Sequence, residues 1–361
     1  MGPATQTFTS TEPLSLYRGG TLPGFTLAWE RWGTLNEDKS NAVLVLGGLS
    51  ASAHAAASHA DPSPGWWQGI IGPGAAIDTN RFYVICINAL GSCFGSTGPA
   101  SVNPHTQTPW RLNLPELAME DTAQAAHSLI TELGIRRLAA LVGPSMGGMA
   151  ALAFLKTYPH SAERLALIST TAAAQPFALA VRALQREAIV SDPDFCAGQY
   201  TDDHRPETGM RIARKLGMIT YRSADEWIER FGRARQTQFD EHGFGMRFEI
   251  EAYLETQAQR FVEQFDPCAY LYLSRAMDAF DASDQDGNLS ALFARTFLGS
   301  ALVLGVDSDL LFPVDQQRTL AEALDSAGGE VQFQALASNK GHDAFLVDSE
   351  LFDAPIRSWL Q

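Results

Sequence analysis

Residues 138–150, LAALVGPSMGGMA, decide the fold of this chain. Residues 138–142 predict a buried strand, and a helix is expected from Gly148 to about Thr157. Between them, residues 143–147 read GPSMG and fit the pattern G-x-S-x-G. In a nucleophile elbow this pattern holds a serine on a turn so tight that glycine is needed two residues before and after it. The alternative is an ordinary strand–loop–helix turn that happens to contain a serine.

Buried strands alternate with helices on both sides of this stretch. A βαβα order with strands that are apolar throughout is typical of a mostly parallel, doubly wound α/β sheet. Further strands are predicted at residues 25–33, 41–48, 82–89, 165–169, 301–306 and 331–335, and helices at residues 116–133, 314–327 and 349–360.

The pattern changes in the middle of the chain, where helical segments dominate and no strong alternating pattern occurs. The helices are expected at residues 176–191, 209–222, 224–234, 249–264 and 269–280. Because core strands lie on both sides, an inserted helical lid is favoured over a separate helical domain. The expected organisation is a core from residues 1–171 and 299–361, with a lid at residues 172–298.

Composition limits the classes of function. The 361 residues are 45% hydrophobic, enough for a sizeable core, and the net charge of −15 argues against a nucleic-acid-binding surface. No apolar run predicts a membrane span or a secretion signal. The histidines lack metal-ligand spacing, so no metal site is expected. The cysteines form no C-x-x-C pair, which favours reduced thiols in a cytoplasmic protein; they are Cys86, Cys93, Cys196 and Cys268.

A nucleophilic serine needs a base to accept its proton and an acid to orient that base. In this fold the acid and then the histidine follow the serine along the chain. His342 is the only histidine after His242, and it follows a predicted strand. Asp307 and Asp309 follow another strand, and Asp309 is preferred because it lies further out in the loop. Taken singly, a loop histidine or an Asp-x-Asp turn has an ordinary structural explanation.

The loop after residues 41–48 is the candidate oxyanion hole, the group of N–H donors that stabilises negative charge in the transition state. The predicted strand ends in Gly47, Gly48, Leu49 and Ser50. Backbone at this position can place an N–H group over the nucleophile. A simple glycine-rich turn is the alternative.

Longer motifs resemble the homoserine/serine O-acyltransferase family of the α/β-hydrolase fold, over about residues 15–360. They are GPSMGGM (143–149), ARKLGMITYRS (213–223), DSDLLFP (307–313) and GHDAFLVD (341–348), with the long segments 71–101 and 248–281. The resemblance implies a transferase that depends on an acyl-CoA, with no bound cofactor. It also implies a homodimer.

The resemblance assigns roles to individual residues. Ser145 would be the acylated nucleophile, His342 the base and Asp309 its partner. Leu49 and Met146 would supply the N–H groups of the oxyanion hole. These five assignments rest on the matching motifs.

Two further residues would bind the acceptor. The resemblance implies that Arg214 holds the carboxylate of the amino acid and that Asp343 holds its amino group. From the sequence alone, Arg214 could equally be a solvated lid residue, and Asp343 a turn or helix-capping residue.

Within this family, one subset is the most similar. It carries G-L-S-x-x-x-H-A, P-G-W-W and L-Q-R-E-A-I, found here at residues 48–55, 64–67 and 184–189. This subset resembles serine O-succinyltransferases of cysteine biosynthesis, which implies L-serine and succinyl-CoA as substrates. Arg186 would meet the distal carboxylate of the succinyl group, or is a helix-surface cation. The alternatives are an acetyltransferase that acts on L-homoserine or L-serine with acetyl-CoA, and an esterase.

Overall fold

The computed structural model describes residues 1–201, 203–237, 245–297 and 299–361. In these residues the main sheet has eight strands in the order β1-β4-β8-β5-β9-β10-β11-β12. Their bounds are β1 Gln6–Ser10, β4 Phe25–Trp32, β8 Tyr83–Ile87, β5 Ala42–Leu46, β9 Ala140–Pro144, β10 Arg164–Ile168, β11 Ser300–Val306 and β12 Glu330–Leu336. Short two-stranded pairs join β2 Leu14–Ser15 with β3 Thr21–Leu22, and β6 Ile71–Gly72 with β7 Ile77–Asp78.

The sheet is mostly parallel, as predicted. β5, β8, β9, β10, β11 and β12 pair in parallel, whereas β1 pairs antiparallel with β4 and β4 pairs antiparallel with β8. The carboxyl ends of the parallel strands therefore meet at one edge, where open α/β sheets bind their ligands.

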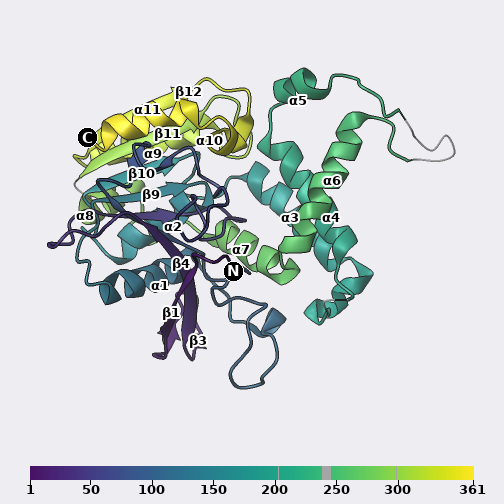
Figure 1. Cartoon of the computed structure of the whole chain (residues 1–361), viewed down its shortest axis with the longest axis horizontal. Coiled ribbons are helices and arrows are strands. Elements are labelled where there is room, and N and C mark those ends of the chain that lie inside the picture. Colours follow the sequence, from purple (N-terminus) through teal and green to yellow (C-terminus); the bar gives the residue numbers. More distant parts are fainter. Residues whose placement is uncertain (202, 238–244, 298) are drawn as a thin grey trace.

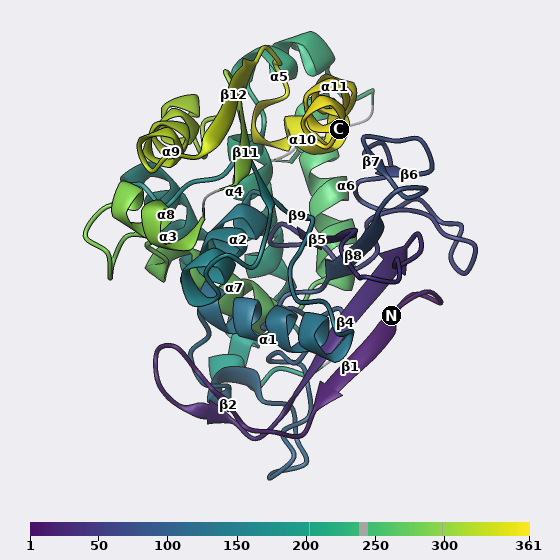
Figure 2. The same cartoon turned by 90° about the vertical axis from the view of Figure 1, so that its left-hand side faces the viewer.

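Both faces of the sheet are buried, which explains why its central strands are apolar throughout. Along β5, Leu44 and Leu46 belong to one core cluster, and Val43 and Val45 belong to the other. The first cluster lies under α1 Met119–Glu132, α2 Met146–Thr157, α8 Leu289–Thr296 and α9 Val314–Ser326. Figure 2 shows these helices on one side of the molecule. The second cluster includes α10 Ala344–Val347 and α11 Glu350–Trp359.

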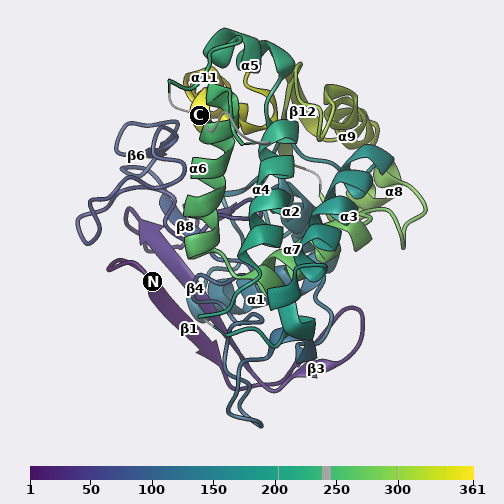
Figure 3. The same ribbon diagram turned by 90° about the vertical axis from the view of Figure 1, so that its right-hand side faces the viewer.

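Helices fill the stretch of chain between β10 and β11. They are α3 Pro176–Val190, α4 Glu207–Tyr221, α5 Ala224–Phe231, α6 Glu249–Gln264, α7 Pro267–Ala279 and α8. Figures 1 and 3 show α3, α4, α5 and α6 together at one side of the sheet. Helix α8, by contrast, packs in the core cluster through Leu292 and Phe293. The division into core and lid at residues 171/172 and 298/299 stays a prediction, and residue 298 lies outside the described residues.

Among the described residues there are also three short 3₁₀ helices, at Arg111–Asn113, Pro193–Gly198 and Gly341–Asp343. In the described part of the chain, no helix has both the length and the apolar character needed to cross a membrane.

Candidate active site

Ser145 lies on a strained turn between β9 and α2. Its φ and ψ are 54° and −124°, values that side-chain-bearing residues rarely adopt. A Cβ at Gly143 would lie 2.3 Å from the carbonyl oxygen of Gly147. A Cβ at Gly147 would lie 1.8 Å from the carbonyl oxygen of Leu46. Both glycines are therefore required for the turn to pack against itself and against β5.

Three side chains from distant parts of the sequence meet at this turn. Ser145 Oγ lies 2.8 Å from His342 Nε2, and His342 Nδ1 lies 2.7 Å from Asp309 Oδ2. Asp309 and His342 are each 3% exposed, and Ser145 is 8% exposed. The three side chains thus form a continuous series from carboxylate to imidazole to hydroxyl, and Ser145 and His342 both line a cavity.

The second oxygen of Asp309 is held by the backbone. Asp309 Oδ1 accepts the N–H groups of Leu311 and Phe312, both at 2.9 Å. Oδ2 is therefore left to face the histidine. Asp307, the alternative acid in the sequence, is exposed.

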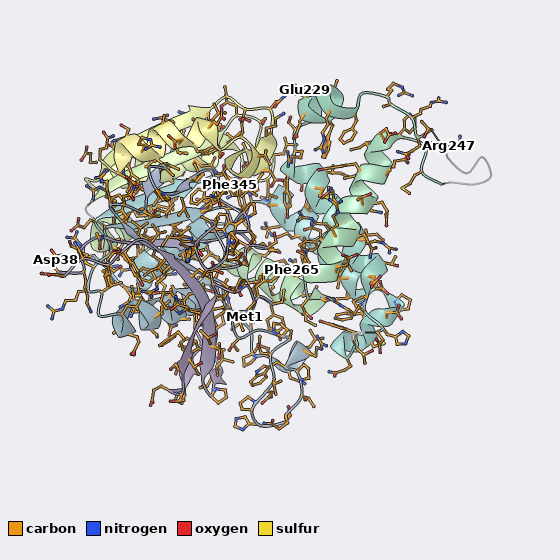
Figure 4. All side chains as sticks on the ribbon, viewed as in Figure 1. Met1, Asp38, Glu229, Arg247, Phe265 and Phe345 are labelled. Carbon is orange, nitrogen blue, oxygen red and sulfur yellow. The ribbon has the colours of Figure 1, made fainter. Side chains whose placement is uncertain are left out.

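His342 is enclosed by aromatic rings. The rings of Phe312, Phe345 and Tyr221 have centroids 5.2, 5.8 and 5.9 Å from the imidazole. Figure 4 places Phe345 near the middle of the molecule, where the C-terminal part of the core faces the inserted helices. Burial lowers the pKa of His342, but the charge and hydrogen bond of Asp309 outweigh it, and the net result is a raised pKa.

Leu49 and Met146 lie on the two backbone segments beside the serine. A Cβ at Gly48 would lie 3.9 Å from Ser145 Cβ, so the backbone just before Leu49 passes close to the nucleophile. Met146 is the first residue of α2, where backbone N–H groups have no partner within the helix. The positive end of the helix dipole also lies there.

The cavity at Ser145 lies between the core and the inserted helices. Its lining includes Gly48, Leu49, Ser50, Ala51, Trp66, Ser145, Leu311, His342, Asp343 and Phe345 from the core, and Val181, Arg182, Gln185, Arg214, Tyr221, Tyr270 and Met277 from the helices. The structure therefore brings Arg214 and Asp343 into one space with the serine and histidine.

Arg214 faces this cavity from α4. Its guanidinium lies over the ring of Phe261, at 4.5 Å from the ring centroid. Within the described residues, its Nε is buried and has no hydrogen-bond partner. A buried guanidinium nitrogen without a partner is costly, and a bound carboxylate would relieve this cost.

Asp343 is fixed from the lid side. Arg222, directly after α4, donates from Nε to Asp343 Oδ2 at 3.1 Å. Ser223 Oγ donates to the carbonyl oxygen of Asn339. A Cβ at Gly341, whose φ is +64°, would lie 2.6 Å from the carbonyl oxygen of Tyr221. The loop that carries His342 is therefore packed directly against the end of α4.

Arg186 is not brought to this cavity. It lines a neighbouring cavity, and its Nη1 lies 2.6 Å from Asp278 Oδ2. Arg182, one helical turn earlier on α3, lines the cavity at Ser145 instead. Its Nε donates to the other oxygen of Asp278. Its Nη2 is buried without a hydrogen-bond partner among the described residues.

Sequence reasoning did not identify Arg182, although the helix pattern contained a signal. The buried residues of α3 are Ala178, Arg182, Gln185 and Ile189. This spacing defines one face of a helix, with an arginine and a glutamine at its centre. Polar residues on the buried face of a helix indicate a polar interior, such as a binding site.

Comparisons with known proteins show the family to which this chain belongs. Residues 41–349 match the family described as alpha/beta hydrolase fold. A serine O-succinyltransferase of Frateuria aurantia is 55% identical over 354 residues, covering 97% of this chain and 96% of the relative.

Two crystal structures have the same fold. The homoserine O-acetyltransferase from Bacillus anthracis has a TM-score of 0.91 at 27% identity, covering 99% of this chain and 97% of the other. An esterase has a TM-score of 0.89 at 28% identity and covers 99% of both chains. The chain therefore belongs to the α/β-hydrolase fold family and, within it, to the homoserine/serine O-acyltransferase family.

Proposed function

We propose that this protein is a serine O-succinyltransferase that moves a succinyl group from succinyl-CoA to the hydroxyl of L-serine. One observation carries the proposal. The cavity at Ser145 is lined by two arginines, the buried Arg182 and the half-buried Arg214, and each has one buried guanidinium nitrogen without a hydrogen-bond partner among the described residues. The reaction also has two carboxylates to bind, one on the amino acid and one at the far end of the succinyl group.

The assignment of the two arginines follows from their neighbours. Arg214 shares the cavity with Asp343, so carboxylate and ammonium of an amino acid would be bound by groups of opposite charge. Arg182 is held by Asp278, which fixes its guanidinium plane. An acetyl group has no carboxylate for Arg182. For this reason we place the succinyl carboxylate on Arg182 rather than on Arg186.

The first half-reaction acylates the enzyme. His342 Nε2 takes the proton of Ser145 Oγ, and Oγ attacks the thioester carbonyl carbon of succinyl-CoA. The N–H groups of Leu49 and Met146 stabilise the resulting oxyanion. Collapse breaks the carbon–sulfur bond, and CoA leaves with the proton from His342.

The second half-reaction transfers the acyl group. L-Serine binds with its carboxylate on Arg214 and its ammonium group on Asp343. His342 takes the proton of the substrate hydroxyl, whose oxygen attacks the ester carbonyl carbon. Collapse frees Ser145 Oγ, which recovers the proton, and O-succinyl-L-serine leaves. The enclosing lid helices exclude water, which would otherwise hydrolyse the ester.

The alternative acceptor and donor are L-homoserine and acetyl-CoA. The TM-score of 0.91 with a homoserine O-acetyltransferase favours this second candidate. Serine and homoserine differ by one methylene, which a shaped pocket distinguishes by only about 10- to 200-fold.

The test is a matrix of L-serine and L-homoserine against succinyl-CoA and acetyl-CoA, with CoA release measured in each combination. We expect the highest kcat/KM for L-serine with succinyl-CoA. CoA release at the full steady-state rate without any amino acid would contradict the transferase and favour an esterase-type hydrolase. Faster turnover with acetyl-CoA would contradict the succinyl assignment.

A further inference from the structure

His54 lies in the loop that follows β5 and makes two hydrogen bonds through its ring. Nδ1 lies 2.8 Å from Glu30 Oε2, and Nε2 lies 2.9 Å from the carbonyl oxygen of Ser63. Glu30 belongs to β4 and is 1% exposed. The imidazole therefore connects the main sheet to two points of one long loop.

The acceptors around the ring favour a positive charge on His54. A carbonyl oxygen only accepts, so Nε2 must carry a proton. Ser63 Oγ, 3.3 Å from Nε2, gives its own proton to Asp61 Oδ1 at 2.6 Å and cannot donate to the ring. With a proton on Nδ1 as well, the ring would also donate to Glu30 Oε2. Asp61 Oδ2, 4.0 Å from Nδ1, favours the same state. These contacts together favour the imidazolium form of His54.

Leu49 belongs to the same loop after β5 that the His54 side chain anchors. The carbonyl oxygen of His54 accepts the backbone N–H of Trp66 at 3.2 Å, and Trp66 Nε1 donates to the carbonyl oxygen of Ser52 at 3.0 Å. Asn88 Nδ2 donates to the carbonyl oxygen of Ala51 at 3.1 Å. Ala51 and Trp66 also line the cavity at Ser145. Displacement of His54 would thus be transmitted to the backbone at Leu49.

We propose that His54 is a positioning residue: held between Glu30 and the Ser63 carbonyl, it fixes the loop that presents the Leu49 N–H to the acyl carbonyl oxygen. The proposal rests on the oxyanion role given to Leu49 under the proposed function. It does not depend on which acyl-CoA or which amino acid is used.

Loss of the His54 proton would leave Glu30 with a buried charge and no cationic partner at this position. Among the described residues, the charged and titratable groups near the pair include Asp61 from the loop and the Cys86 thiol from β8, whose pKa the charge of Glu30 helps to raise. Burial raises the pKa of Cys86, so this thiol stays neutral. Burial lowers the pKa of His54, but Glu30, Ser63 and Asp61 outweigh it, so the net shift is upward. The pair therefore weakens as the pH rises.

The experiment measures acylation with p-nitrophenyl acetate, which requires Ser145 and the oxyanion hole but no CoA or amino acid. The variants are His54→Gln, Glu30→Gln and the double variant, with His59→Gln as the control because His59 is an exposed histidine of the same loop. The burst amplitude counts active sites, and the burst rate reports acylation per site.

We expect each single variant to slow the burst by about 10- to 100-fold, less than the full loss of an oxyanion donor. The double variant removes both charges and keeps the hydrogen bonds, so it should recover most of the rate. The burst rate of the wild type should decrease at alkaline pH, where His54 loses its proton. The double variant should show no such decrease. The control should stay within about twofold, as surface changes usually do.

Two results would overturn the proposal. One is a burst rate per active site that stays at the wild-type value in both single variants, even if they unfold at lower temperature. The other is a double variant as slow as either single variant. If the wild type is acylated normally but does not transfer the acyl group to L-serine, the proposed function is refuted. The burst assay would still test the role of His54 in that case.

Discussion

The core and lid walls of the cavity differ in how completely their polar groups are paired. On the core side, Ser145, His342 and Asp309 form a continuous chain, and Asp309 Oδ1 is held by two backbone N–H groups. On the lid side, Arg182 and Arg214 each keep a buried nitrogen without a partner among the described residues.

This difference separates the chemistry from the recognition. A group that moves protons must be oriented before the substrate arrives, so its hydrogen bonds are made within the protein. A group that binds a carboxylate must keep donors free for it. The core wall is therefore expected to set the rate, and the lid wall to select the substrates.

The largest loss of kcat is expected for substitutions in the core wall. Ser145→Ala and Asp309→Asn should each lower kcat by about 10,000-fold or more, because one removes the nucleophile and the other the acceptor that orients His342. CoA release measures this effect. Asp307→Asn is the matched control, since Asp307 is exposed two residues earlier, and it should retain normal turnover. Equal losses at both positions would contradict the role given to Asp309.

On the lid wall, Arg214→Leu should lower kcat/KM for L-serine by about 100- to 1,000-fold, the usual cost of losing a charged hydrogen-bond partner. The acylation half-reaction, followed by CoA release in a single turnover, should change little. Arg211→Leu on the same helix is the control, because Arg211 pairs with Glu255 at 3.2 Å. Loss of acylation in Arg214→Leu would remove the separation between the two walls.

The next largest effect is expected on kcat/KM for the acyl-CoA substrate. Arg182→Leu should lower kcat/KM for succinyl-CoA by about 30- to 100-fold and leave acetyl-CoA within a few-fold, since only succinyl offers a distal carboxylate. Steady-state kinetics with both donors measure this ratio. Arg186→Leu should change the ratio less, because Arg186 acts on Arg182 only through their shared partner Asp278. A larger change in Arg186→Leu would restore the assignment of the acyl group to Arg186.

The smallest effect is a shift in pH dependence. His342 must lose its proton to act as a base, so the rate rises with pH through its raised pKa. The charge of Asp343 contributes to raising that pKa. Asp343→Asn should therefore move the acidic limb of the acylation rate to lower pH, as measured by single-turnover CoA release. An unchanged limb would mean that Asp343 acts on the acceptor alone.

The arrangement of the core wall was the easier part to predict, because each of its features depends on a short stretch of sequence. Glycines at 143 and 147 are required by the closeness of the backbone, and this requirement is visible as a motif. Chain order selected His342, and distance from the strand end selected Asp309. The parallel strands appeared as apolar runs because both faces of the sheet are buried.

The lid wall was harder to predict because its geometry depends on packing between helices. Arg182 and Arg186 lie on the same helix and both pair with Asp278 of α7, so the local sequence does not show which of them lines the cavity at Ser145. The edge strand β1, QTFTS, is half-exposed and polar, so it lacks the apolar signal of the central strands. Helix α8 was not among the predicted helices.

The contact between α4 and the histidine loop limits how such enzymes can be recombined. The backbone of Tyr221 touches Gly341, Ser223 bonds to Asn339, and Arg222 bonds to Asp343, so three links cross from the inserted helices to the segment that holds the base. A chimera that takes its helices from an esterase of the same fold would have to reproduce all three. Residues 339–343 would have to be exchanged together with the helices, although more than a hundred residues separate the two segments in the chain.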